Sequence, residues 1–142
     1  MKKILIIDGY NAIQKIRRFA GILDESLEAA RAEFVKSLGD YRARNRAFDE
    51  IIVAFDGARN KGSSLKKYRS GFVEVMFSSY GESADDLIKA LLIENISCDI
   101  TVVSDDNYVA NNCRAYKADI MPCREFEGLI GVKADKIFKW KL

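Results

Sequence analysis

The chain has 142 residues, of which 49% are hydrophobic and 31% charged, and its formal net charge is +2. Such a composition indicates a compact globule, most simply one domain over residues 1–142, and argues against a disordered or fibrous chain. The apolar runs are too short to cross a bilayer and the first residues lack a signal-peptide pattern, so we expect a cytoplasmic protein with no membrane partner.

Histidine is absent from the sequence. This absence excludes Ser-His-Asp triads, Cys-His pairs and histidine-ligated zinc sites. There are three cysteines, Cys98, Cys113 and Cys123, with no C-x-x-C pair, which favours reduced thiols over disulfides or a zinc site. An enzyme built from this chain must therefore use carboxylates, lysines, hydroxyls or a bound cofactor.

Apolar strands alternate with helical patterns along the chain. The expected strands cover residues 3–8, 50–56, 72–77, 99–104 and 118–122. The expected helices cover residues 10–21, 24–45, 83–95, 105–118 and 123–131, the second of them capped by Asp24 or Ser26. Residues 57–71, with glycine, serine and lysine, are expected to form a mobile loop, and residues 135–142 an edge strand or a frayed end.

This alternation predicts an α/β fold with a mostly parallel sheet, because parallel strands need crossover helices that cover both faces. With right-handed crossovers, the carboxyl ends of the strands meet at one edge, where ligands bind in such folds. Asp8, Asp56 and Asp105 each follow an apolar strand. We therefore expect three carboxylates on the same edge of the sheet.

Each of these aspartates has a structural alternative, because acidic residues after strands commonly cap the next helix. As a group they would repel one another, by about 1 kcal/mol for two charges 4 Å apart in water, unless a cation lay between them. A fourth acid comes from the start of the helix at 83–95. There Ser83 and Asp86 are spaced as a capping box, which leaves Asp85 for the cluster, with Glu82 as a weaker candidate.

Hard divalent cations such as Mg²⁺ and Mn²⁺ take carboxylate oxygens and bind phosphates, which would relieve the repulsion. Held beside basic loops, such a metal activates water for phosphodiester hydrolysis and requires no histidine. Asn11 follows Asp8 by three residues and could hold a metal-bound water or a phosphate oxygen, with helix capping as the alternative. The same two interpretations, ligand binding or helix capping, apply to Ser104.

Five segments together, LIIDGYNAI, VAFDG, YGESADDLI, VVSDD and CREFE, resemble the YacP-like branch of the NYN domains, within the PIN-like nuclease superfamily. The resemblance extends from Lys2 to about Leu129. It implies a Rossmann-like PIN/NYN sandwich whose acidic cleft binds Mg²⁺ or Mn²⁺ and cuts RNA endonucleolytically. The residues that match the family's motif are Asp8, Asn11, Asp56, Asp85 and Asp105. Related proteins are linked to ribosome-associated cleavage of mRNA, which implies the ribosome as a partner.

The leading hypothesis is therefore a metal-dependent endoribonuclease. In it Asp8, Asp85 and Asp105 hold the metal, and Asp56 and Asn11 support them. Loop cations would contact RNA phosphates, and a tyrosine would stack on an unpaired base. The expected RNA-binding residues are Lys61, Lys66, Lys67, Arg69, Ser104 and Tyr10 or Tyr68. Packing against the sheet edge is the alternative for Tyr10.

Two other functions stay open on the sequence. One is a non-catalytic RNA- or ribosome-binding module with the same fold, against which the full set of acids argues. The other is a phosphatase or phospho-acceptor domain, which also gathers aspartates at strand ends. The first strand here ends in Asp-Gly-Tyr, without the D-x-D of haloacid-dehalogenase phosphatases or the paired acids of response regulators.

Overall fold

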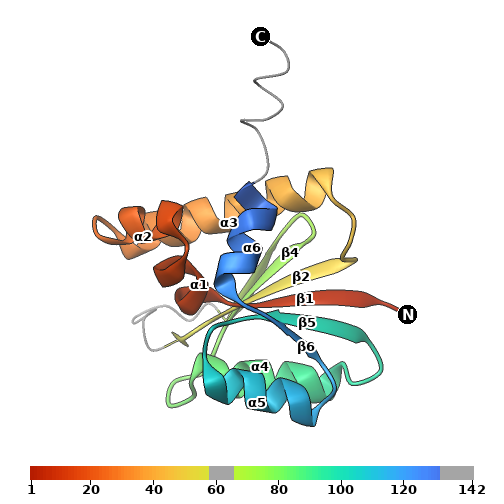
Figure 1. Ribbon diagram of the computed structural model, residues 1–142. Helices are drawn as coiled ribbons and strands as arrows, with labels where there is room; N and C mark the ends of the chain where they lie inside the picture. Colours follow the sequence, from red (N-terminus) through yellow and green to blue (C-terminus); the bar gives the residue numbers. More distant parts are fainter. Residues whose placement is uncertain (58–65, 132–142) are drawn as a thin grey trace.

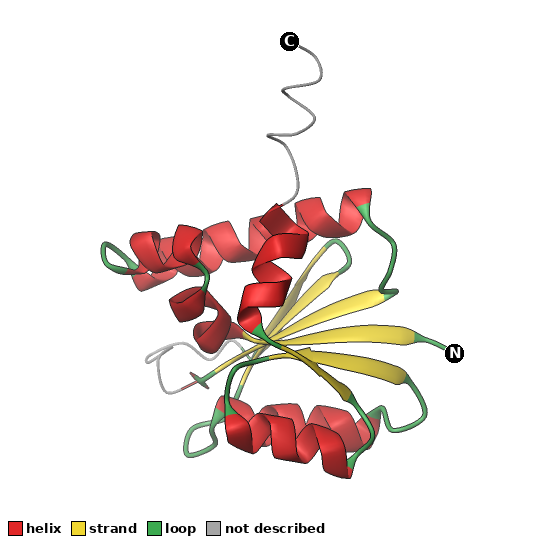
Figure 2. Cartoon of the chain, viewed as in Figure 1, coloured by secondary structure: helices red, strands yellow, loops and turns green. Residues whose placement is uncertain are grey.

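The computed structural model describes residues 1–57 and 66–131, and in that part of the chain a six-stranded sheet is covered by helices on both faces (Figures 1 and 2). The strands are β1 (Lys3–Asp8), β2 (Glu50–Phe55), β3 (Lys67–Ser70), β4 (Val73–Phe77), β5 (Asp99–Val103) and β6 (Asp119–Met121). The helices are α1 (Gly9–Lys15), α2 (Arg17–Leu23), α3 (Leu27–Arg44), α4 (Ala84–Glu94), α5 (Asn107–Ala115) and α6 (Cys123–Gly131).

The strand order is β3-β4-β2-β1-β5-β6, and every neighbouring pair is parallel except β3 with β4. After their first residues, β1 and β2 are buried throughout, as expected for central strands covered on both faces. The register places Asp8 opposite Ala54 of β2 and Ile7 opposite Val103 of β5. The predicted α/β class with a mostly parallel sheet is confirmed.

Two hydrophobic cores lie on the two faces of the sheet. Helices α1, α2, α3 and α6 cover one face, and α4 and α5 cover the other (Figure 1). Ile7 packs with Phe34 and Phe126 in the first core, and Ile6 packs with Leu92 in the second. The side chains of successive residues of β1 therefore pack into opposite cores. Within the described residues, no helix combines the length and the apolar character needed to cross a membrane.

The first expected helix, 10–21, is in fact two. Ile16 has an extended backbone, with ψ at 116°, and separates α1 from α2. No proline marks this break in the sequence. Ile16 is buried in the first core, so packing of its side chain accompanies the change of direction. The other helices start within a few residues of their expected positions, and Ser26 caps α3 by accepting a hydrogen bond from the Ala29 N–H.

Part of the segment expected to be a loop, 57–71, is the edge strand β3. It pairs antiparallel with β4, Lys67 opposite Met76 and Ser70 opposite Val73. The turn between them contains Gly71 at a φ of +61°, a conformation that glycine adopts readily. A polar segment becomes a strand here because β4 offers an unpaired row of backbone groups. Lys61 and the tail 135–142 lie outside the described residues.

The end of β2 is joined to the end of β4 by a close backbone contact at Gly57. The Gly57 N–H donates to Ser78 Oγ at 2.8 Å, and that hydroxyl donates to the Glu82 carbonyl at 2.9 Å. A Cβ at position 57 would overlap the Ser78 carbonyl group. Glycine is therefore required directly after Asp56, and the contact fixes where the chain leaves β2.

Replacing Gly57 by alanine is expected to lower the free energy of unfolding by about 1–3 kcal/mol, because the new methyl group forces the ends of β2 and β4 apart. Gly128→Ala is the matched control. Gly128 is helical and has open space around its Cα, so alanine there should add about 0.5–1 kcal/mol. Urea unfolding measures both values, and a Gly57→Ala variant as stable as the parent would contradict the contact.

Candidate functional site

Asp8 is a buried carboxylate at the end of β1, with 6% of its surface exposed. It occupies the N-cap position of α1, yet its side chain makes no capping hydrogen bond. Instead, Asp8 Oδ2 accepts a hydrogen bond from Ser104 Oγ at 2.8 Å. Burial raises the pKa of Asp8 to about 6 against the lowering effect of this bond, with further upward contributions from the charges of Asp85 and Asp106. Helix capping therefore does not explain this aspartate.

Asp85 lies in the first turn of α4, within electrostatic reach of Asp8. Its neighbours form the predicted capping box: the Asp86 N–H donates to Ser83 Oγ and the Ser83 N–H donates to Asp86 Oδ2, each at 3.1 Å. Asp85 takes no part in that box. Burial raises the pKa of Asp85, and the charges of Asp106, Asp86 and Asp56 raise it further.

We call Asp8, Asp56, Asp85 and Asp106 the acidic edge. They come from the carboxyl ends of β1, β2 and β5 and from the start of α4. Within the described residues, Asp8, Asp85 and Asp106 form no ion pair with a lysine or arginine. Negative charge is thus collected at one end of the sheet, in a setting that disfavours the charged forms of Asp8 and Asp85.

The two aspartates after β5 have different partners. Asp105 Oδ1 accepts a hydrogen bond from the Cys123 N–H at 2.9 Å, at the start of α6. Asp106 Oδ1 accepts from the N–H groups of Tyr108 and Val109, at 2.8 and 3.3 Å, and so caps α5. The structural alternative, in which Asp105 or Ser104 caps this helix, is not what the structure shows, because the helix begins later than the sequence suggested.

Asp106 is the member of this pair whose charge acts on both Asp8 and Asp85. The sequence predicts Asp105 in the cluster and did not single out Asp106, which the structure adds. The available signal was the order of residues before the helix, since aspartate followed by Asn-Tyr-Val fits an N-cap at 106 as well as at 105. One residue of difference in the helix start thus decides which of the two aspartates caps α5.

Asn11 connects α1 to the ends of β5 and α6. Its Oδ1 accepts from the Asp105 N–H at 2.8 Å and from Cys123 Sγ at 3.4 Å. Ser104 is 3% exposed, and its Oγ accepts from the Asp106 N–H at 3.0 Å. Because these bonds use the amide oxygen of Asn11, its Nδ2 is the group left to donate to a ligand. Ser104 is surrounded by protein groups and touches Asp8 directly.

The cysteines are free thiols. Burial raises the pKa of Cys123 to about 12, and the charges of Asp105 and Asp8 raise it further. Burial raises the pKa of Cys113 to about 11. A thiol that stays protonated at neutral pH is a poor nucleophile. Cys123 therefore belongs to the hydrogen-bond network around Asn11 and is not a source of covalent chemistry.

The lysines and arginine expected to contact RNA lie at and along β3. Lys66 and Lys67 are exposed at its start. Arg69, further along the strand, forms an ion pair with Glu74 at 3.5 Å. Lys61 lies in the segment that the structure does not describe. Two lysines next to the carboxyl end of β4 are thus presented to solvent, while the arginine has a protein partner.

Tyr10 is a packing residue in this structure. It is 7% exposed, its ring centroid is 4.7 Å from that of Phe55, and its hydroxyl accepts a hydrogen bond from Arg31 at 3.0 Å. The tyrosines presented to solvent near the acidic edge are Tyr80, 96% exposed before α4, and Tyr108, 52% exposed in the first turn of α5. Sequence reasoning singled out neither, because exposure of a loop tyrosine depends on its tertiary neighbours.

The donor set of the acidic edge fits a hard divalent cation, since it consists of carboxylate oxygens without a cationic partner at Asp8, Asp85 or Asp106. Across residues 1–57 and 66–131, however, no three acidic or cysteine side chains lie close enough together to enclose an ion. Mg²⁺ is commonly held by one or two carboxylates, with water and substrate phosphate completing its shell. The edge suits that mode of binding.

Asp8→Asn is expected to change how stability depends on pH. Because the folded pKa of Asp8 is about 6 against an ordinary 3.8, the folded state binds this proton more tightly than the unfolded chain. Stability from this group is present below pH 4 and is lost as pH rises through 6, by about 3 kcal/mol in all. The variant should lack that loss, so its stability relative to the parent should rise over this range.

Urea unfolding in the presence of chelator measures the free energy of unfolding at each pH. The exposed Asp99→Asn, at the opposite end of β5, is the control. Parallel pH profiles for the parent and Asp8→Asn would contradict the prediction.

Comparison with known proteins shows which family this chain belongs to. The chain is 32% identical over 105 residues to the uncharacterized protein YacP of Bacillus subtilis, a match that covers 72% of this chain and 60% of that protein. Two crystal structures of Rae1 (YacP) from Bacillus subtilis superpose with TM-scores of 0.77 and 0.76, at 26% and 25% identity. They cover 96% and 98% of this chain and 78% and 80% of theirs. The model of the YacP-like NYN domain matches residues 5–140. The chain therefore belongs to the YacP-like NYN domain family, within the PIN-like nucleases.

Proposed function

We propose that the protein is a metal-dependent endoribonuclease that cuts RNA phosphodiester bonds at the acidic edge. The observation that carries the proposal is the position of Asp8, whose buried side chain makes no capping hydrogen bond and lies within electrostatic reach of Asp85 and Asp106. A structural role would be better served by an uncharged residue there. A divalent cation, Mg²⁺ or Mn²⁺, offsets the repulsion and gives these carboxylates a common ligand.

Each group at the edge has a distinct part in this proposal. One or two of the carboxylates of Asp8, Asp85 and Asp106 hold the cation, and water and substrate phosphate complete its shell. Asp56 adds negative charge near Asp85. The cation would supply an activated water and charge neutralisation at the phosphate. Ser104 holds Asp8 in position through its 2.8 Å hydrogen bond. The Nδ2 group of Asn11 is available to donate to a phosphate oxygen of the substrate.

Contacts to the rest of the RNA come from groups beside the edge. Lys66 and Lys67 are exposed and can neutralise backbone phosphates, and Lys61 belongs to the same basic segment. Tyr80 and Tyr108 are exposed aromatic surfaces on which unpaired bases can stack. The family resemblance extends the proposal to mRNA presented by the ribosome. Comparing cleavage of the same mRNA free and on ribosomes tests that extension.

A second candidate function is a non-catalytic RNA-binding module. The observation that favours it is the absence, in the described part of the chain, of three acids close enough together to enclose a metal ion. In the nuclease proposal, one or two carboxylates hold the metal and water completes its coordination shell. In the module proposal, the protein binds RNA but no longer cleaves it. RNA that is bound with equal affinity in Mg²⁺, in Mn²⁺ and in chelator, and is never cut, would favour the module.

Asp8→Asn is expected to slow cleavage of a labelled single-stranded RNA by about 100-fold or more, because several kcal/mol of metal-dependent stabilisation is lost. Chelator should abolish cleavage by the parent, and added Mn²⁺ should restore it. Asp99→Asn, at the far end of β5, is the control and should cleave as the parent does. Cleavage that persists in Asp8→Asn, or in chelator, would refute the proposal.

Asp105 and Asp106 offer a matched pair of substitutions. Asparagine at 106 keeps an oxygen to cap α5, and asparagine at 105 keeps an acceptor for the Cys123 N–H, so both variants should fold. Asp106→Asn is expected to slow cleavage at least about tenfold, since the charge it removes acts on Asp8 and Asp85. Asp105→Asn should have the smaller effect. If Asp105→Asn instead slows single-turnover cleavage more than Asp106→Asn does, Asp105 is the metal ligand, as the sequence predicts.

A further inference from the structure

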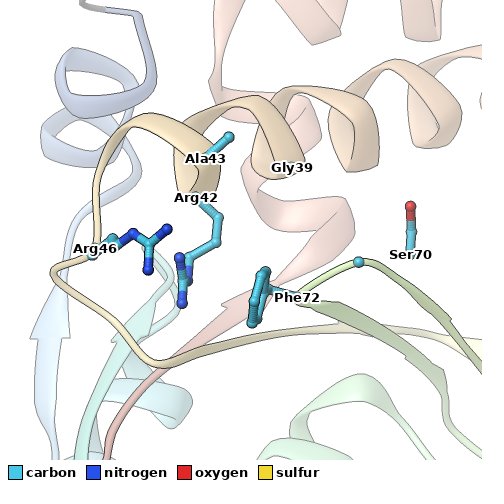
Figure 3. A pocket seen from close by; sticks show the side chains of 7 residues that line it. Gly39, Arg42, Ala43, Arg46, Ser70 and Phe72 are labelled. Atoms are coloured by element: carbon cyan, nitrogen blue, oxygen red, sulfur yellow. The ribbon is translucent and has the colours of Figure 1, made fainter.

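A cavity lies at the opposite end of the strands, where α3 ends and β3 turns into β4 (Figure 3). Its volume is about 380 Å³, within the range of sites that hold small ligands. Arg42 and Arg46 line it from the end of α3 and the residues just beyond, and Ser70, Gly71 and Phe72 line it from the turn. None of the described residues that line the cavity is acidic, so its charge is positive.

Arg42 is an unusual residue for such a position. It is 7% exposed, and its Nε is closed to solvent without a hydrogen-bond partner. Its guanidinium carbon lies 4.1 Å from the centroid of the Phe72 ring, and within the described residues it forms no ion pair. A desolvated charge without a counter-charge is costly, and a bound anion would offset that cost.

The helix dipole accounts for only part of this arrangement. Cations are favoured in the last turn of a helix, and α3 ends with Arg42 and Arg44. Arg44 fits that explanation: it donates to the Ile130 carbonyl at 2.8 Å and joins α3 to α6. Arg42 lines the cavity instead, together with Arg46 (Figure 3). Two guanidinium groups that line one cavity repel each other, and a phosphate bound by both would turn that repulsion into attraction.

Phe72 supplies the second element of a nucleotide site. Its ring stands beside Arg42 in the lining of the cavity (Figure 3), and 57% of the residue is exposed. An exposed phenylalanine with arginine on one side is the kind of surface on which single-stranded bases stack. The cavity therefore combines a phosphate-binding pair, Arg42 and Arg46, with an aromatic platform.

Strand β3 runs from the acidic edge to this cavity. It begins beside the carboxyl end of β4, where the Phe77 N–H donates to the Lys66 carbonyl at 2.8 Å, and it ends at Ser70 in the cavity wall. The four paired positions of β3 are three rises apart and span about 10 Å at the usual rise of a strand. Lys67 and Tyr68 are exposed along this path, Tyr68 at 39%. A strand of RNA a few nucleotides long can thus reach from one edge to the other.

We propose that Arg42, Arg46 and Phe72, here called the arginine pocket, bind one nucleotide of single-stranded RNA several residues away from the scissile bond. The arginines hold its phosphate, and Phe72 stacks on its base. The inference rests on the proposed function in that RNA is the ligand, and it adds a second point of attachment at the amino ends of the parallel strands. Substrate length, and not only the acidic edge, then determines affinity.

Binding of labelled RNA to an Asp8→Asn background, which leaves the RNA uncut, tests the pocket. For an RNA of about twelve nucleotides, Arg46→Gln and Phe72→Ala should each raise the dissociation constant about fivefold or more. Arg46→Gln should also reduce the slope of log affinity against log salt by about 0.7, as expected for one lost phosphate contact on a single strand. Both positions are accessible side chains, so these variants avoid the folding risk of replacing the buried Arg42; thermal unfolding checks this.

Arg114→Gln is the matched control, because Arg114 is also an exposed arginine near a helix C-terminus, on α5 in the other layer. It should bind RNA as the background does. An RNA of about four nucleotides, long enough for the acidic edge alone, should be insensitive to Arg46→Gln and Phe72→Ala. Equal affinity of all variants for the longer RNA would overturn the proposal. AMP binding that requires Arg46, combined with RNA binding that does not, would also overturn it in favour of a free nucleotide.

Cleavage measured separately, with Asp8 intact, keeps the two proposals apart. If the parent never cuts RNA but the pocket variants weaken binding in the Asp8→Asn background, the nuclease proposal fails and the arginine pocket stands. If cleavage depends on Asp8 while the pocket variants bind and cut the longer RNA as the parent does, the pocket fails and the nuclease proposal stands.

Discussion

The buried carboxylate of Asp8 constrains everything around it. A charge with 6% of its surface exposed must be stabilised by its neighbours, and here the stabilising contact comes from Ser104, at the end of the adjacent parallel strand. The same hydroxyl accepts from the Asp106 backbone, and Asn11 accepts from that of Asp105. The segment after β5 is thus tied to the end of β1 and the start of α1. Side chains far apart in the sequence are brought to one edge because parallel strands end together.

The two edges of the sheet have opposite character. At the carboxyl ends, aspartates gather in a setting that disfavours their charged forms. At the amino ends, a largely buried arginine lies beside an exposed aromatic ring and a second arginine. Strand β3 is the element that links them, and it carries exposed lysines near its start. An acidic edge that we propose to bind a divalent cation and an arginine pocket that we propose to bind phosphate, joined by a basic strand, would form a surface suited to an extended polyanion.

Some parts of the site were predictable because they depend on local sequence alone. The aspartate after a fully apolar strand located Asp8, and the spacing of Ser83 and Asp86 correctly identified the capping box, leaving Asp85 for the cluster. Capping and strand burial are decided within a few residues, so pattern reasoning reaches them. Which of Asp105 and Asp106 caps α5 was not reachable in this way. It turns on where α5 begins, and helix starts shift by a residue or two under tertiary packing.

Other features required the folded chain. Tyr10 lies in the first turn of α1, at the carboxyl ends of the strands, which suggested a contact with RNA, but Phe55 and Arg31 enclose it. Residues 67–70 resemble a loop until β4 provides the partner for their backbone groups. The burial of Arg42 depends on Phe72, which is distant in sequence and reaches it only through the turn after β3.

By itself, the sequence determined the α/β class, the alternation of strands and helices, the absence of histidine chemistry and the identity of the acids at the strand ends. These follow from hydrophobic periodicity and composition, which are local or global properties of the chain and need no coordinates. Only the tertiary structure decided which carboxylates share one electrostatic environment, which aromatic rings are exposed and where an arginine lacks a partner. Burial and distance between residues remote in sequence govern those properties, and strand order and helix packing set both.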